Sequence, residues 1–355
     1  MTKEFTLSPR KKQILLSAVE SYIENALPIT SGNVQSNYFS SLSSATLRSE
    51  LANLEEMGYL RQLHTSSGRV PTTQAYRYYV NNLIASRPID KELIDDIKDK
   101  FVVRSAFLLD VLDSLAKKMG EFTHLPTFVM MKGNGELTIN AINIIPLITG
   151  QALLLLQTNA GIINNTFVMP DGVTEEHCKD ASKFLTNNLC GKTISDVINN
   201  FDKYNTSFHS QIHYFNDLFV AVTDMLKEFA NSGGSFMTHG STSKLLENPE
   251  YKDISKATKF LQVIENESEL KEIINGIDEN SNQDIVFSIG DENGNDDCDY
   301  SIVKANYHLS DGITASLGIV GPERMDYARI ASALKFILDE MNSKIYDKGE
   351  DDGKK

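Results

Sequence analysis

Apolar residues recur every three to four positions in the first part of the chain, which is typical of helices with one buried face. The apolar residues between Ile14 and Ile23 keep this period. Ser8 and Pro9 stand before them, and this pair provides a hydroxyl cap and a proline at the first helical position. Pro28 interrupts the pattern. The sequence therefore predicts a first helix that packs on a core, followed by a short second helix.

A third helix is predicted in the segment SSATLRSELANLEEMGYL, which starts at Ser43. Ser43 or Ser44 can cap this helix, and Gly58 can end it in a left-handed turn. Its buried stripe has the i, i+4, i+7 spacing of one helix face and consists of Leu47, Leu51 and Leu54.

A β-hairpin is predicted directly after the third helix. Residues 60–64 alternate as a strand, residues 66–68 form a Ser-Ser-Gly turn, and Arg69-Val70 begin the returning strand. A hairpin with a basic residue near its tip resembles a wing that lies along a phosphate backbone. Three helices and this hairpin within the first 87 residues predict a winged helix-turn-helix domain that binds duplex DNA.

The exposed face of the third helix carries short polar or forked donor side chains, which reach base edges and phosphates. The tyrosines at 76, 78 and 79 have helical spacing, and we expect them in a packing seam between wing and core rather than in base stacking. Arg77 between them is expected to reach a phosphate. The predicted DNA contacts are Ser44, Thr46, Arg48, Ser49, Asn53, His64, Arg69 and Arg77.

Charge is divided unevenly along the chain. Residues 1–87 hold nine basic and six acidic residues, a net charge of +3. The whole chain has 34 basic and 48 acidic residues, so the remainder carries a net charge of −17. This division favours a polyanion at the N-terminal domain and repels it from the rest.

The pattern after residue 88 alternates between groups of helices and groups of strands. Helices are predicted over 90–120, at 174–190, 194–201, 208–231, 253–264 and 267–276, and from Glu323 to Tyr346. Strands are predicted within 127–169 and 284–321. Strands that stop and resume more than 100 residues later indicate a sheet domain interrupted by an insertion. The predicted class is α+β.

Several long segments together resemble one family. The third helix and the segment LRQLHTSSGRVPTTQAYRYYV closely resemble the heat-inducible transcription repressors called HrcA. So do GSTSKLLENPEYKDISK at 240–256, VFSIGDEN at 286–293 and GIVGPERMDYARI at 318–330. The resemblance spans nearly the whole chain in the family's order.

This resemblance implies a homodimeric repressor that binds an inverted-repeat operator ahead of chaperone operons and is released on heat stress. It also implies the GroEL chaperonin as a partner in recovery of the active state. The implied layout is a winged helix at 1–87, a GAF-like antiparallel sheet domain at 88–135 and 208–346, an inserted α/β dimerising domain at 136–207, and a charged tail at 347–355. One departure is Thr30-Ser31-Gly32, where the family usually has a lysine that contacts a phosphate.

A second function fits the same layout. A GAF-like fold often holds a small molecule, so the alternative is a ligand-gated transcriptional regulator that senses a small molecule in this domain. No residues in the predicted sheet identify a ligand, and screening for thermal stabilisation by metabolites would separate the two functions.

Catalytic and metal signatures are weak throughout. His209 and His213 stand at i and i+4 without a nearby third ligand. The acidic run that begins at Asp291 has Asp296 where a calcium loop needs glycine, so a solvated loop is expected. No nucleophile or phosphate-loop signature occurs. We therefore predict no enzyme, no cofactor and no metal.

The cellular compartment follows from cysteine use and from hydropathy. Three scattered cysteines do not form a disulfide framework. No apolar run reaches the roughly 18 residues that a membrane helix needs, and the N-terminus lacks the apolar block of a signal peptide. These features predict a cytoplasmic protein without a membrane partner.

Overall fold

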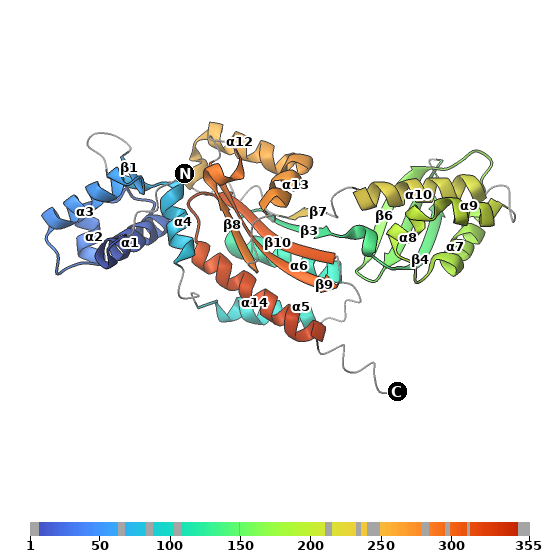
Figure 1. Cartoon of the computed structure of the whole chain (residues 1–355), viewed down its shortest axis with the longest axis horizontal. Coiled ribbons are helices and arrows are strands. Elements are labelled where there is room, and N and C mark those ends of the chain that lie inside the picture. The colour runs from blue at the N-terminus through green and yellow to red at the C-terminus, as the bar shows by residue number, and fades with distance from the viewer. Residues whose placement is uncertain are drawn as a thin grey trace.

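The computed structural model of the chain is elongated and has three units in a row (Figure 1). We call them the head (residues 7–82), the central unit and the distal unit. The structure describes residues 7–62, 68–82, 88–102, 108–148, 150–209, 215–231, 236–239, 249–277, 284–294, 299–310 and 313–346.

The head contains four helices and one hairpin, namely α1 (Pro9–Asn25), α2 (Ser31–Asn37), α3 (Ser44–Glu56), β1 (Leu60–Gln62), β2 (Arg69–Pro71) and α4 (Thr73–Asn81). Each helix begins after a hydroxyl residue whose side chain accepts a backbone N–H of the first turn. These capping residues are Ser8, Thr30, Ser43 and Thr72. The caps explain why four short helices start at defined positions.

The first and third helices end where the sequence predicts. Ala26 adopts a left-handed conformation with φ of 56° after α1, and Pro28 follows it. Gly58 has φ of +83° after α3, a value that favours glycine. The stripe formed by Leu47, Leu51 and Leu54 is completely buried. The predicted helices and hairpin of the head are therefore present.

The central unit is built on a five-stranded antiparallel sheet with strand order β7-β3-β10-β9-β8. The strands are β3 (Thr127–Lys132), β7 (Phe236–His239), β8 (Ile285–Ile289), β9 (Tyr300–Ser310) and β10 (Ile313–Pro322). Residues far apart in the sequence are thus neighbours, because Leu317 pairs with Val129 on one side and with Ala305 on the other.

Helices cover both faces of this sheet (Figure 1). One face packs against α6 (Leu108–Thr123) and α14 (Tyr327–Tyr346), with α5 (Lys91–Val102) packed against α6. The other face is covered by α12 (Ile254–Glu265) and α13 (Glu267–Gly276). Thr127 donates to the carbonyl of Ala116 in α6 (2.9 Å), whereas buried Lys304 donates to the carbonyl of Ile274 in α13 (2.9 Å). The double cover explains why consecutive residues of β9 are buried.

The distal unit has a three-stranded antiparallel sheet with strand order β4-β5-β6. Its elements are β4 (Ile139–Pro146), β5 (Gln151–Thr158), β6 (Ile162–Val168), α7 (Glu175–Leu189), α8 (Ile194–Asn199), α9 (Phe201–His209) and α10 (Phe215–Asn231). Helix α7 lies along β4, where Ser182 Oγ accepts the N–H of Ile144 (2.9 Å) and Thr186 Oγ1 accepts the N–H of Ile142 (2.9 Å). The helices pack against one face of this sheet.

The buried residues form two cores. One is shared by the head and the central unit, and the other consists mainly of residues of the distal unit, joined by Met131 of β3 and Ile313 of β10. Helix α10 supplies Leu218, Phe219, Val222 and Leu226 to the distal core. The elements around this core therefore extend beyond 136–207, the range expected for the insertion. The reason is that α10, which lies after residue 207 in the sequence, also packs on this core.

The predicted α+β class with antiparallel sheets is confirmed, and three elements differ in detail. Strand β7 has only four residues and was not predicted. The helix expected over 208–231 begins at Phe215, after a separate α9. The last helix begins at Tyr327 rather than Glu323, because Asp326 Oδ1 caps it by accepting the N–H of Arg329 (3.0 Å).

Candidate nucleic-acid interface

Helix α3 presents a polar surface opposite its leucine stripe. Ser44, Arg48 and Ser49 are exposed, and Thr46 and Asn53 are half-buried. Since the leucines fix the rotation of the helix on the core, these side chains lie on the remaining surface. The structure therefore brings five of the eight predicted contact residues together on one helix.

Two of these residues also hold the helix in place. The Ser43 hydroxyl accepts the N–H of Thr46 (3.1 Å) and lies 2.8 Å from its hydroxyl. The Ser44 hydroxyl lies 3.1 Å from that of Ser31 in α2. The start of α3 is thus fixed to the preceding helix, and the row that begins at Ser44 has a defined orientation.

The β1–β2 hairpin follows α3 with Arg61 opposite Val70 and Gln62 opposite Arg69. Arg69 is half-buried, with 18% of its side chain exposed, and its Nε lies 2.7 Å from Glu55 Oε2 in α3. Its backbone also pairs with Ile29. Arg69 and Gln62 thus form the strand pair nearest the turn of the hairpin, and Glu55 engages the Arg69 guanidinium, while His64 lies outside the described residues.

Arg61 is an exposed cation that the predicted contact set omitted. It lies on β1, in the hairpin that Arg69 also belongs to. Alternation along residues 60–62 could have identified it, because Leu60 is buried and a strand turns its next side chain to the opposite face.

Arg77 is turned toward the central unit instead of the surface of α3. Its guanidinium pairs with Glu292, and its Nη2 donates to the carbonyl of Phe287 (2.8 Å). The tyrosines beside it are packing residues, as predicted, since Tyr76 and Tyr79 are 2% and 6% exposed. Glu292, which was expected in a solvated loop, lies instead in the short 3₁₀ helix Gly290–Asn293 and is the ion-pair partner of Arg77.

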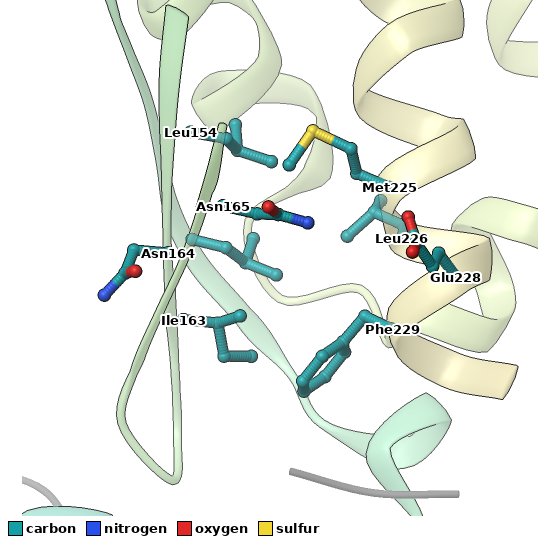
Figure 2. A pocket seen from close by; sticks show the side chains of 9 residues that line it. Leu154, Ile163, Asn164, Asn165, Met225, Leu226, Glu228 and Phe229 are labelled. Atoms are coloured by element: carbon teal, nitrogen blue, oxygen red, sulfur yellow. The ribbon is translucent and has the colours of Figure 1, made fainter. Parts of the chain in front are cut away.

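A cavity and a groove lie among the described residues of the distal unit. A cavity of about 180 Å³ lies between β5, β6 and α10 and is lined mainly by apolar side chains such as Leu154, Met225 and Phe229, with Asn165 among them (Figure 2). A wider groove of about 660 Å³ lies between β4 and α7. The cavity suits an apolar group, whereas the groove combines apolar residues of β4 with polar and charged residues of α7, among them Glu175, Lys179 and Lys183.

Two features are absent from the ranges that the structure describes. These ranges contain no group of three or more histidine, cysteine or acidic side chains that could hold a metal ion. In the same part of the chain, no helix combines the length and the apolar character needed to cross a bilayer.

Comparisons with known proteins agree along the whole chain. The family model described as HrcA protein C terminal domain matches residues 109–331. The heat-inducible transcription repressor HrcA of Ruminiclostridium cellulolyticum is 28% identical over 96% of this chain and 97% of its own length. That of Symbiobacterium thermophilum is 30% identical over 95% of this chain and 99% of its own length.

A solved structure shares the fold. A crystal structure described as that of a hypothetical protein has a TM-score of 0.66 and 18% sequence identity, and the match covers 96% of this chain and 99% of that one. The likeness extends over the head, the central unit and the distal unit, and the sequence matches cover the same length. The chain belongs to the HrcA family of heat-inducible transcription repressors.

Proposed function

We propose that this protein represses heat-shock chaperone operons by binding an inverted-repeat operator as a homodimer and releasing it on heat stress. The observation that carries the proposal is the arrangement of α3. Its leucine stripe and its contact with α2 hold an exposed row of Ser44, Arg48 and Ser49 in a fixed orientation. Such a helix is suited to the major groove of duplex DNA.

In this proposal the head is a winged helix-turn-helix. Helix α3 reads base edges, with Arg48 as the forked donor suited to guanine. The β1–β2 hairpin is the wing, and Arg61 and Arg69 provide its phosphate contacts. Arg77 is left out of the contact set because its guanidinium is engaged by Glu292.

The outer face of the distal sheet is the proposed dimer surface. The helices pack on its inner face, and alternation places Ile145, Leu153, Leu155, Ile162 and Val168 on the other. Ile145, Ile162 and Val168 are 42%, 50% and 76% exposed. Asn164 and Thr166 lie between Ile162 and Val168 on the same face, so apolar and polar side chains alternate there. Exposed apolar side chains gathered on one face mark an interaction site, and a two-fold axis would bury this face against its own copy.

Two heads on one dimer explain how heat could release the operator. The second half-site binds with a high effective concentration only while both heads belong to one particle. Loosening of the dimer or of a head removes this gain. We include GroEL as a partner for recovery after heating, which is tested by comparing recovery of operator binding with and without the chaperonin.

Operator binding by the full chain tests the proposal. We expect a duplex from upstream of a chaperone operon to bind far more tightly than a scrambled duplex, as measured by fluorescence anisotropy. Arg48→Ala should cost about 1–3 kcal/mol and relax base preference at the position it contacts. Lys335→Ala, an exposed change in α14, is the control. Equal binding of scrambled DNA by the unaltered protein would refute the proposal.

A further inference from the structure

The junction between the head and the central unit is held by side-chain links that start from α1 and α4. Helix α3 lies on the far side of the head (Figure 1). The surface proposed to bind DNA therefore faces away from the central unit, while the opposite surface of the head packs against that unit.

Arg77 in α4 forms the first link. Its guanidinium pairs with Glu292 in the short 3₁₀ helix Gly290–Asn293 and donates to the carbonyl of Phe287 in β8 (2.8 Å). Glu292 is oriented for this pairing, because its Oε2 also accepts the N–H of Ile289 (2.8 Å). About a third of each side chain of the ion pair is exposed, 31% for Arg77 and 32% for Glu292, so either one can be changed without opening a core.

Thr73, at the first turn of α4, forms the second link. Its hydroxyl donates to Glu323 Oε1 (2.7 Å) in the turn before α14. Gly290 lies directly against this pair, and a Cβ atom there would meet Glu323 Oε1 at 2.0 Å and Thr73 Oγ1 at 2.8 Å. The link is therefore closely packed.

Arg324 forms the third link, to the end of α1. Its Nη1 donates to the carbonyl of Ile23 (2.9 Å), and its Nε lies 2.5 Å from Glu250 Oε1. Only 12% of the Arg324 side chain is exposed. A cation is favourable at this position, because the carbonyls of the last helical turn carry partial negative charge.

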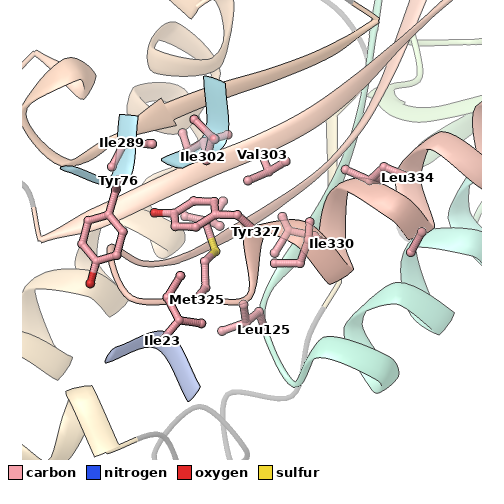
Figure 3. Packing of buried hydrophobic residues seen from close by; sticks show 14 of the residues in the cluster. Ile23, Tyr76, Leu125, Ile289, Ile302, Val303, Met325, Tyr327, Ile330 and Leu334 are labelled. Atoms are coloured by element: carbon pink, nitrogen blue, oxygen red, sulfur yellow. The ribbon is translucent and has the colours of Figure 1, made fainter. Parts of the chain in front are cut away.

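Apolar side chains fill the space between the links (Figure 3). Ile23 and Tyr76 of the head lie beside Met325 and Tyr327 of the central unit, and the rings of Tyr76 and Tyr327 are 5.9 Å apart. This continuous core makes the junction resemble the inside of one domain more than a flexible linker.

We propose that Thr73, Arg77 and Arg324 are positioning residues that fix the orientation of the head on the central unit and thereby select the spacing of the operator half-sites. This inference rests on the proposed function. Adding one base pair between half-sites rotates the second one by about 35° and shifts it by about 3.4 Å. A rigidly held pair of heads cannot follow this change, whereas loosened heads can.

Binding to operators of graded spacing tests the inference. The full chain, Arg77→Ala, Glu292→Ala, their double variant, Arg77→Lys and the control Lys335→Ala are titrated by fluorescence anisotropy. The probes are a single half-site and inverted repeats whose spacer differs by one or two base pairs in either direction. Thermal melting followed by circular dichroism verifies that each variant is folded.

We expect every variant to bind the single half-site within about twofold of the original chain, because Arg77 lies away from α3. The original chain should lose roughly tenfold or more when the spacer changes by one base pair, because the second head no longer contributes. Arg77→Ala and Glu292→Ala should each bind the natural spacing roughly fivefold more weakly and discriminate spacings by less than about threefold. The double variant should match either single variant, and Arg77→Lys should retain most of the selectivity.

Three results would overturn the inference. They are unchanged spacing selectivity in Arg77→Ala, tighter operator binding by that variant, and an equal loss on the half-site and the full repeat. The last would mean that Arg77 contacts DNA directly. A lack of preference for inverted repeats in the unaltered chain would instead overturn the proposed function itself.

Discussion

Gly290→Ala is expected to lower the free energy of unfolding through two effects, namely strain in the backbone and loss of a hydrogen bond at the junction. Gly290 has φ of +50°, and an alanine in this left-handed region costs roughly 1–2 kcal/mol. Its Cβ would also meet Glu323 Oε1 at 2.0 Å, so the carboxylate must move away from the Thr73 hydroxyl. Loss of a hydrogen bond to a charged group costs roughly 1.5–3 kcal/mol.

Together these effects amount to about 2.5–5 kcal/mol of unfolding free energy. For a domain of roughly 150–250 residues, that loss corresponds to a decrease in Tm of roughly 5–20 °C, measured by circular dichroism at 222 nm. Gly294→Ala is the matched control, because Gly294 also has positive φ, +97°, but a Cβ there would have no atom within 4 Å. Gly294→Ala should therefore lower Tm only by the amount that backbone strain causes.

A second comparison isolates the contact with Glu323. In a Glu323→Ala background, Gly290→Ala should cost less than it does in the unaltered chain, since the contact with Glu323 is gone and only the Thr73 hydroxyl, at 2.8 Å, remains close to the new Cβ atom. If Gly290→Ala lowers Tm no further than Gly294→Ala in the unaltered background, the close packing of this link has no energetic consequence and the reasoning fails.

Three further outcomes are expected. Burial raises the pKa of Glu323, so the contribution of this carboxyl group to stability is present at low pH and is lost as pH rises through its folded-state pKa. Glu323→Gln, which still accepts the hydroxyl hydrogen bond, should therefore raise Tm over the original chain, and the difference should grow as pH rises above the ordinary carboxyl range. Arg69→Ala should weaken binding to all duplexes alike and reduce the slope of log binding constant against log salt concentration by about 1. Glu55→Gln, which releases the Arg69 guanidinium, should not reduce this slope, and a change in base preference with an unchanged slope in Arg69→Ala would contradict the assignment. Ile145→Lys should shift the protein to monomer in analytical ultracentrifugation, and Ile254→Lys, at a more exposed isoleucine of α12 (81% against 42%), should not; dimers in both would rule out the outer face as the interface.

Local chemistry explains what could be predicted of the head from sequence. The cap at Ser43, the end near Gly58 and the leucine stripe are fixed by residues within one helix length. The same holds for Ser8 and Pro9 at the start of α1. These signals are short-range, so the helices and the exposed face of α3 follow from them directly.

The parts that could not be predicted depend on partners distant in sequence. The sequence around Arg77 predicts a surface cation, because its partner Glu292 lies 215 residues away in the sequence and is brought close only by the fold. Strand β7 has four residues and no alternation of its own, and it forms because β3 offers a free edge. Similarly, α10 joins the distal core through contacts that periodicity alone cannot assign.

The two hydroxyl groups of α7 that bind the backbone of β4 also limit how copies of this protein can associate. Unpaired strand edges are sites of uncontrolled growth into larger aggregates, a particular hazard during heating. Ser182 and Thr186 occupy backbone groups of β4 that an incoming strand would need. With the β4 edge blocked, the distal sheet can add a strand only at β6, so pairing through the edges of this sheet stops at two chains.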